Sequence, residues 1–316
     1  MKTSINGIIP VMLTPFTQKG EIDWQGYEAL IEWYISNGAQ ALFAVCQSSE
    51  MQFLSLRERV ELARFTVEAV KGRLPVIASG HISNGPDDQK IELGKMAETG
   101  VDGVVLVTNR MDGPSEDKQV WRSNLDALLA ELPKDMPLGL YECPAPYRRL
   151  LSDDEVSYCA NSGRFVILKD VSCDLTTVKR RLQLTRGTPL KISNANAAIA
   201  WPALRAGAAG FCGVMLNVHP DLYRWLQDHG PSHPELAQEL SVFLVLSAMC
   251  ESMGYPKIAK LIQQRLGTFS SIHSRTIPFE LEERFWGLSA IIDNIEAGSA
   301  YFRKQIQNIA ATTGRI

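Results

Sequence analysis

The stretch of sequence that bears most directly on the fold is FVILKDVS, residues 165–172. A short apolar run of this kind, bounded by polar residues, is typical of a parallel strand that is buried on both faces. Seven further runs of the same character recur at intervals of about 20 to 35 residues. Together they predict eight strands, over residues 7–16, 39–46, 74–80, 103–109, 137–144, 165–172, 189–196 and 210–217.

The segments between these runs have the periodicity of helices. Residues 23–36 carry apolar side chains at i, i+3, i+4 and i+7, and Asn37-Gly38 ends the pattern. Residues 55–70 repeat it and open with Ser55 and Glu58 at the spacing of a capping box. Strands and helices in strict alternation indicate an α/β protein with a parallel sheet. Eight such units favour a closed (β/α)8 barrel, the TIM barrel.

An open, doubly wound sheet is the competing topology. No G-x-G-x-x-G motif follows any of the runs, which argues against the dinucleotide-binding version of that topology. After residue 217 the strand signal stops, and the remaining chain has helical segments separated by Gly and Pro. We therefore expect a barrel over residues 1–221 and a C-terminal helical extension over residues 222–316.

Composition excludes several classes of protein. The 316 residues are 45% hydrophobic and 21% charged, which is typical of a soluble globular chain with a large core. With 35 acidic and 32 basic residues there is no broad cationic field, so we expect no nucleic-acid partner. The six cysteines never form a C-x-x-C pair, which argues against a zinc ribbon. We recognise no signal peptide and no long apolar span, and we expect a cytoplasmic protein with no membrane partner.

Lys169 is the most informative candidate for chemistry, because barrel enzymes react at the carboxyl ends of their strands. Period-2 alternation puts Phe165, Ile167 and Lys169 on one face of the sixth strand. If that face is the barrel interior, burial without a fixed anion lowers the pKa of a lysine by several units from about 10.4. The neutral amine can then attack a ketone and form a Schiff base. The alternative is a solvated lysine, or one paired with Asp170.

Tyr141 and two serines are the other candidates. Tyr141 precedes Lys169 by 28 residues, about one βα unit, so we expect the two side chains on neighbouring strands. A phenol in that place can carry protons to and from a substrate. Ser48 and Ser49 follow the second run and offer hydroxyls and backbone N–H groups for a carboxylate. The alternatives are a tyrosine that only covers the barrel mouth and serines that only cap a helix.

Five segments resemble motifs of one known family. The dihydrodipicolinate synthase and N-acetylneuraminate lyase superfamily consists of (β/α)8 class I aldolases that form a Schiff base, and the resemblance covers nearly the whole chain. The first strand of that family ends in Thr-Pro-Phe, its second is followed by G-[TS]-T-G-E, and its fifth and sixth carry Y-N-x-P and [IL]-K-[ED]. The matching segments here are GIIPVMLTPF at 7–16, CQSSE at 46–50, YECP at 141–144, LKD at 168–170 and, for the eighth strand, GFCGV at 210–214.

The resemblance implies a function. Lys169 would form an imine with a 2-oxo acid, usually pyruvate, and Tyr141 would move protons. The iminium withdraws electrons, so the enzyme would make or break the adjacent C–C bond or dehydrate a keto acid. No metal and no cofactor are implied, and the family analogy implies a homo-oligomer, a tetramer. The implied substrate-binding residues are Ser48, Ser49, Gln47 and the backbone of Cys212.

The chain also departs from the family. Dihydrodipicolinate synthases have a hydroxyl at the position of Gln47, which relays protons to a tyrosine from a neighbouring subunit, and Met111 stands at the position of that tyrosine. They carry an arginine where this chain has Pro146, although Arg148 or Arg149 could substitute for it. We therefore expect an aldolase or dehydratase other than the lysine-pathway synthase.

The loop after the second strand and its surroundings carry two further expectations. Cys46 and Ser49 stand where the family has glycine, so the backbone there must avoid positive φ or accept strain. Arg110 lies near the predicted rim, where it either recognises an anionic tail or is solvated.

Two other functions compete with the Schiff-base lyase. A metal-assisted barrel enzyme would use strand-end groups such as His81, Glu142 and Asp170. A non-catalytic relative would bind a keto acid as a sensor or scaffold, and the altered loop after the second strand is the feature that suggests it.

Overall fold

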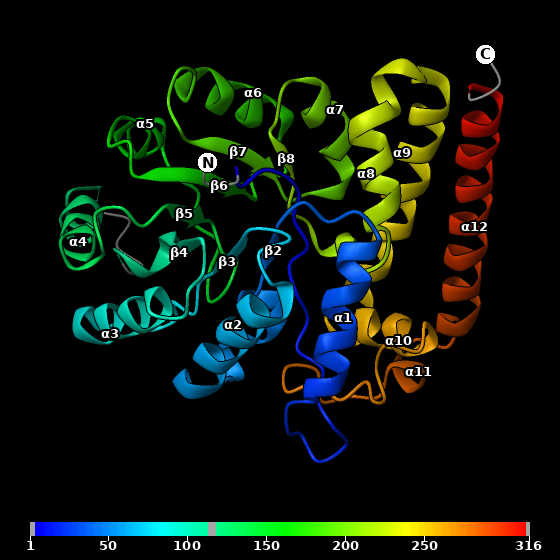
Figure 1. Ribbon diagram of the computed structural model, residues 1–316, viewed down its shortest axis with the longest axis horizontal. Coiled ribbons are helices and arrows are strands. Elements are labelled where there is room, and N and C mark those ends of the chain that lie inside the picture. Colours follow the sequence, from blue (N-terminus) through cyan, green and yellow to red (C-terminus); the bar gives the residue numbers. More distant parts are fainter. Residues whose placement is uncertain (1–3, 113–117, 314–316) are drawn as a thin grey trace.

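The computed structural model describes residues 4–112 and 118–313. Its strands are parallel and form one eight-stranded sheet in the order β1-β8-β7-β6-β5-β4-β3-β2, with helices around it (Figure 1). The α/β barrel predicted from the apolar runs is therefore confirmed. The strands are β1 Gly7–Ile8, β2 Leu42–Phe43, β3 Val76–Ala78, β4 Gly103–Val107, β5 Leu138–Tyr141, β6 Phe165–Asp170, β7 Lys191–Asn194 and β8 Gly210–Phe211.

Backbone hydrogen bonds close the sheet between β1 and β2. The N–H of Phe43 donates to Pro10 O at 3.0 Å, and the N–H of Met12 donates to Phe43 O at 3.0 Å. One residue pair earlier, the N–H of Gln40 donates to Ile8 O at 2.8 Å. The two ends of the strand order are thus joined, which distinguishes this fold from an open, doubly wound sheet.

A helix follows every strand, and the sequence specifies where the first two begin. The Asp23 side chain accepts a hydrogen bond from the N–H of Gly26 and so caps α1. Ser55 and Glu58 form the capping box that their spacing predicts at the start of α2. The barrel helices are α1 Trp24–Ser36, α2 Leu56–Val70, α3 Pro86–Ala97, α4 Lys118–Glu131, α5 Asp153–Asn161, α6 Leu175–Leu184, α7 Ala200–Arg205 and α8 Pro220–His229.

The strands are shorter than the runs that predicted them. The last run covers residues 210–217, but β8 ends at Phe211 and Val214–Asn217 form a 3₁₀ helix. Most of that helix is buried, because it lies at the covered mouth of the barrel. An apolar run therefore indicates burial, whereas hydrogen bonding to neighbouring strands decides where a strand ends.

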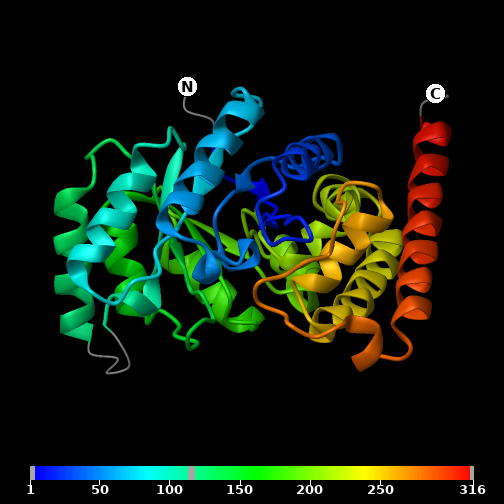
Figure 2. The same cartoon turned by 90° about the horizontal axis from the view of Figure 1, so that it is seen from below.

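A second apolar cluster joins the C-terminal extension to the barrel. It combines Ile8 and Phe211 of β1 and β8 with side chains of the helices that follow. Because α8 contacts β1 and α7, we propose that the extension begins after His229, rather than after residue 221. Figure 2 shows the last helix at the edge of the molecule, away from α3 and α4. The extension contains α9 Pro234–Ala248, α10 Lys257–Arg265, α11 Leu281–Arg284 and α12 Leu288–Thr313.

One segment of the described chain, Pro234–Met253, is long and apolar enough to cross a membrane, with a mean hydropathy of 1.3. Its longest uncharged stretch lies between Glu239 and Glu251, shorter than a span requires. Leu240 and Leu244 of this segment are buried in the cluster that joins the extension to the barrel. A single apolar helix that packs in this way is weak evidence for a membrane span.

A buried ion cluster fixes the ends of β5 and β6. Arg181 of α6 donates to Glu142 at 2.5 and 2.9 Å and to Asp170 at 2.5 Å, and all three side chains are at most 1% exposed. Glu142 also accepts from the N–H groups of Leu151 at 2.7 Å and Val171 at 3.2 Å. The residues that follow Tyr141 and Lys169 are thereby tied to one guanidinium.

We expect Arg181→Met to destabilise the fold by about 3 to 5 kcal/mol, because it leaves two buried carboxylates without their counter-ion. Arg180→Met is the matched control, since Arg180 is adjacent and its ion pair with Asp153 is exposed; that pair is worth about 1 kcal/mol or less. Urea unfolding followed by circular dichroism measures both. Equal unfolding free energies for the two variants would contradict the role of the cluster.

Candidate active site

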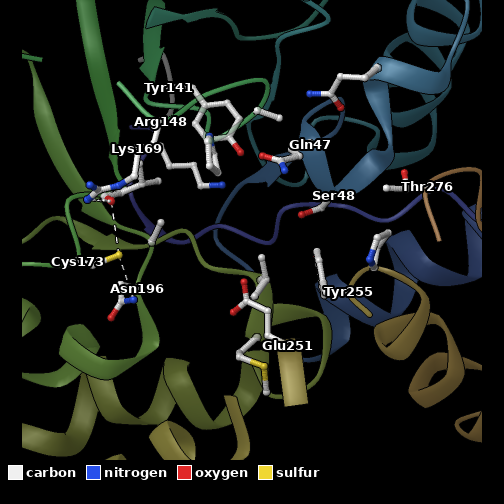
Figure 3. A pocket seen from close by; sticks show the side chains of 18 of the residues that line it. Gln47, Ser48, Tyr141, Arg148, Lys169, Cys173, Asn196, Glu251, Tyr255 and Thr276 are labelled. Carbon is white, nitrogen blue, oxygen red and sulfur yellow. Dashed lines mark hydrogen bonds between the residues drawn. The ribbon is translucent and has the colours of Figure 1, made fainter. Parts of the chain in front are cut away.

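A cavity of about 550 Å³ opens at the carboxyl ends of the strands (Figure 3). One wall consists of residues from β5, β6 and the loops after β2, β7 and β8. The facing wall comes from the extension, at the 3₁₀ helix Met249–Met253 and the start of α10. In a barrel this end is where chemistry takes place.

Lys169 projects into this cavity from β6. The side chain is buried, with 5% of the residue exposed. Its Nζ lies 4.2 Å from the centre of the Tyr141 ring and 6.0 Å from that of Phe43. Tyr141 and Lys169 are paired positions of β5 and β6, as their spacing in the sequence predicts. The amine is thus surrounded by aromatic faces rather than by bulk water.

Asp170 is not the partner of Lys169. Neighbouring residues of a strand point to opposite faces, and the Asp170 carboxylate lies outside the ring of strands, bound to Arg181. Among the described residues, no carboxylate forms an ion pair with Lys169 Nζ. The alternative of a solvated lysine, or one paired with Asp170, is therefore wrong.

Tyr141 lies beside a buried thiol. Cys143 is next to its hydroxyl, and the Cys143 Sγ donates to Gln47 Oε1 at 3.3 Å. The ring of Phe43 packs edge-on against Tyr141, with centroids 5.7 Å apart. Burial raises the pKa of Tyr141 well above its ordinary value, so the phenol is neutral over the physiological range. The contact between Cys143 and Gln47 could not be predicted from the sequence, because only tertiary packing brings these two residues together.

The loop after β2 brings Gln47 and Ser48 to the cavity. Cys46 is extended, with φ of −151°, and the left-handed residue is Glu50, with φ of 61°. The backbone therefore avoids positive φ at the two positions where the family has glycine. Neither the N–H of Gln47 nor that of Ser48 donates to a described residue, and the Ser48 hydroxyl lies beside that of Tyr255. These groups are available to a carboxylate.

The structure places two other predicted residues outside the cavity. The Ser49 hydroxyl faces the core, where it accepts from the N–H of Cys46 at 3.1 Å and lies within 2.9 Å of the carbonyl oxygens of Met12 and Ala44. The backbone of Cys212, which the resemblance implied for the site, does not line the cavity, because its N–H donates to Asn194 O at 2.8 Å and the residue is fully buried. The motif position of Ser49 did not specify the direction of its side chain.

The arginines divide into two groups. Arg110 and Arg148 line the cavity. Arg148 Nη2 donates to the carbonyl oxygens of Val171 at 3.2 Å and Ser172 at 2.7 Å, which holds its guanidinium at the rim. Arg149 is buried and paired with acidic side chains, so it cannot replace the arginine that the family carries at Pro146.

The metal site considered from the sequence does not assemble. Glu142 and Asp170 are both occupied by Arg181. His81 Nδ1 accepts from the N–H of Val107 at 3.0 Å, its Nε2 lies 2.9 Å from Gln89, and burial lowers its pKa to about 4. Within residues 4–112 and 118–313, no group of three His, Cys, Asp or Glu side chains is arranged to hold a metal.

Sequence reasoning missed the residues that the extension contributes. Glu251, Tyr255 and Thr276 line the cavity, and Glu251 points into it (Figure 3). The Tyr255 hydroxyl accepts from Asn217 Nδ2 at 2.9 Å. Gly254-Tyr255-Pro256 is one of the Gly and Pro breaks between the helical segments after residue 217, and nothing in the pattern indicates that this break returns to the barrel mouth.

The chain resembles proteins of known family. Residues 4–276 match the family model described as the dihydrodipicolinate synthetase family. A 4-hydroxy-tetrahydrodipicolinate synthase of Shewanella sp. (strain W3-18-1) is 29% identical over 289 residues, which cover 90% of this chain and 95% of the relative. The enzyme of that name from Oceanobacillus iheyensis is 30% identical over 212 residues, 67% of this chain and 70% of the relative.

Solved structures agree with this comparison. Dihydrodipicolinate synthase DapA-2 from Bacillus anthracis superposes with a TM-score of 0.83 at 25% identity and covers 91% of this chain and 97% of its own. YagE, a prophage protein of E. coli K12 that was solved in complex with pyruvate, also superposes with a TM-score of 0.83. The identity is 20%, and the match covers 92% of this chain and 99% of YagE. At 20% identity, the similarity to YagE shows the fold alone.

Proposed function

Because this chain belongs to the dihydrodipicolinate synthetase family, we propose that it is a class I lyase that binds pyruvate or a related 2-oxo acid as a Schiff base on Lys169. The observation that carries the proposal is the pairing of Lys169 with Tyr141 on neighbouring strands, at one cavity. Complexes of two structural neighbours with pyruvate support this substrate class. The steps proposed below involve no metal and no cofactor.

The reaction begins at the amine. The Lys169 nitrogen adds to the ketone carbon, and a proton moves from nitrogen to the ketone oxygen to give a carbinolamine. The hydroxyl takes up one proton and leaves as water, which gives the iminium. Loss of a proton from the adjacent carbon then gives an enamine, whose carbon attacks an aldehyde, and the new alkoxide is protonated. Water finally hydrolyses the imine and restores Lys169. The reverse sequence cleaves the C–C bond.

Tyr141 and Ser48 have separate roles in this scheme. The neutral phenol of Tyr141 donates protons to the ketone oxygen and the departing hydroxyl and takes them back at later steps. Ser48 and the free N–H groups of its loop hold the carboxylate of the 2-oxo acid. Gln47 lies beside that carboxylate and accepts from Cys143.

The lysine-pathway reaction is not the one we propose. Gln47 accepts from the Cys143 thiol with its amide oxygen and offers no hydroxyl that could relay protons onward. Pro146 lines the cavity where the synthases have an arginine. We propose an aldol acceptor of different chemistry, or dehydration of a keto acid, in a cytoplasmic homo-oligomer such as the tetramer that the family analogy suggests.

Reductive trapping tests the function. Borohydride added with pyruvate reduces an imine to a stable amine, so we expect the protein to gain the mass of one reduced pyruvate and the labelled peptide to contain Lys169. A panel of 2-oxo acids tests substrate class in the same experiment. An unlabelled protein that nevertheless binds pyruvate would indicate a non-catalytic binder, and a label on any other residue would exclude the proposed nucleophile.

The thiol of Cys143 provides a milder test of the same site. We expect Cys143→Ala to lower kcat about fivefold, because the Tyr141 hydroxyl loses its neighbouring thiol and a hydrogen bond is worth about 1 kcal/mol. Cys143→Ser should restore most of the rate, since a hydroxyl accepts and donates in the same place. Cys159→Ala, a buried thiol on α5 outside the cavity, is the control in steady-state kinetics. Equal rates for Cys143→Ala and Cys159→Ala would contradict this role.

A further inference from the structure

A buried ion pair behind the cavity wall joins the C-terminal extension to the loop after β2. Glu50 lies two residues after Ser48 in this loop, and Lys260 belongs to α10. Both side chains are fully buried, and the Lys260 ammonium donates to the Glu50 carboxylate. Neither residue is among those that line the cavity. The pair therefore does not touch a substrate, and its influence on the reaction must pass through the loop.

The Glu50 carboxylate is held by the extension on both of its oxygens. Oε1 accepts from Lys260. Oε2 accepts from the Ser274 hydroxyl at 2.9 Å and from the N–H of Thr276 at 2.7 Å. A buried carboxylate needs such donors to offset its desolvation, and water cannot replace them at a side chain with no exposed surface. These bonds therefore fix the loop to the extension.

The Lys260 ammonium is enclosed by three parts of the chain. Besides its bond to Glu50, it donates to His273 O at 2.9 Å. It also lies 4.3 Å from the centre of the Phe16 ring, which belongs to the segment between β1 and α1. The ammonium thus lies where this segment, the loop after β2 and the chain after α10 meet.

The turn that carries the carboxylate-binding groups ends at Glu50. The N–H groups of Gln47 and Ser48, which donate to no described residue, belong to the 3₁₀ helix that Glu50 terminates with a left-handed φ of 61°. This conformation is unfavourable for a residue other than glycine, and it persists only where surrounding contacts hold it. The Ser49 hydroxyl bonds to the barrel core, and the Glu50 carboxylate bonds to the extension. Together they set the place of the two N–H groups.

We propose that Lys260 and Glu50 are positioning residues, through which the extension places the carboxylate-binding groups of Gln47 and Ser48 and so sets the affinity for the 2-oxo acid. The inference rests on the proposed function. It gives the extension a part in binding the first substrate without any contact between the ion pair and that substrate. Neither residue takes part in forming the imine on Lys169.

The test measures labelling of Lys169 by borohydride as a function of pyruvate concentration. In Lys260→Met the half-saturating concentration should rise about tenfold, the effect of losing one hydrogen bond between charged groups, because the carboxylate-binding N–H groups lose their fixed place. The rate at saturating pyruvate should change little, since the amine of Lys169 is unaltered.

Lys257→Met is the matched control. Lys257 is also a buried lysine of α10, but its ammonium pairs with Glu280 of the extension and not with the loop after β2. This variant should keep the half-saturating pyruvate concentration of the wild type. An equal rise in Lys257→Met and Lys260→Met would overturn the inference, because loss of any buried lysine from α10 would then explain it.

A double variant separates positioning from folding. Lys260→Met leaves the Glu50 carboxylate buried without its counter-ion, which is strongly destabilising, whereas Glu50→Gln/Lys260→Met carries neither charge and should fold. The double variant should show the same rise with pyruvate. Acetone, a ketone without a carboxylate, should label Lys169 equally in the double variant and the wild type. A matching loss with acetone would overturn the inference, because the damage would then lie at Lys169.

Labelling of the wild type separates this inference from the proposed function. A wild type that pyruvate and borohydride leave unlabelled would overturn the proposed function and the inference with it. A labelled wild type with the same half-saturating pyruvate concentration as the double variant would overturn the inference alone.

Discussion

Lys169→Ala is expected to lose all labelling by pyruvate and borohydride and all measurable turnover. The variant lacks the nitrogen that bonds to the ketone carbon, so neither the imine nor any later intermediate can form. Binding of the 2-oxo acid should weaken but persist, since the carboxylate-binding loop with Ser48 is untouched. Intact-mass spectrometry after reduction and a coupled rate assay measure the two losses, and thermal unfolding confirms that the variant is folded.

A second buried lysine, Lys260, serves as an internal control in the labelling experiment. Lys260 is fully buried, and burial lowers its pKa to about 8, which is the property expected of a nucleophilic amine. Its ammonium, however, is bound to Glu50 and donates to His273 O at 2.9 Å, away from the cavity. Peptide mapping should therefore give no adduct on Lys260. Labelling that persists in Lys169→Ala would place the nucleophile elsewhere.

Tyr141→Phe is expected to lower kcat by about 10²- to 10⁴-fold, the range for loss of a general acid and base. The ring remains, so its packing against Phe43 and the position of Lys169 should change little. KM for the 2-oxo acid should therefore change much less than kcat. Steady-state kinetics separate the two parameters, and trapping should be slowed rather than abolished.

The pH profile checks the same role. Because burial raises the pKa of Tyr141 well above its usual value, the phenol stays protonated as the pH rises through the neutral and mildly alkaline range. Its ionisation should therefore not limit the wild-type rate there. Phe43→Leu is the control, because it removes the edge-on ring but keeps the phenol. A rate in Tyr141→Phe no lower than in Phe43→Leu would exclude the phenol as the proton carrier.

The sequence predicts the barrel because the relevant signals are local. Eight apolar runs alternate with helical periodicity, and each unit can be recognised without knowing its neighbours. The caps of α1 and α2 follow from Asp23, Ser55 and Glu58 in the same way. The lengths of the strands could not be predicted, since a buried residue can lie in a strand or in the turn that follows it. The run at 210–217 yields only a short strand for this reason.

The sequence predicts those residues of the site that lie at the carboxyl ends of the strands. Lys169, Tyr141, Ser48 and Gln47 are brought to one cavity, because parallel strands put their carboxyl ends at one rim. Ser49 is adjacent in the chain yet faces the core, since the 3₁₀ turn after β2 directs consecutive side chains apart.

The sequence by itself determined the alternation of strands and helices and the lysine and tyrosine one βα unit apart, because those features depend on residues that are close in the chain. Only the tertiary structure decided what surrounds them. The hydrogen bond from Cys143 to Gln47, the ion pair of Arg181 with Glu142 and the place of Glu251 at the same cavity as Lys169 all join residues far apart in sequence. Such contacts exist only once the sheet has closed and the extension has packed on β1 and β8, so no local pattern encodes them.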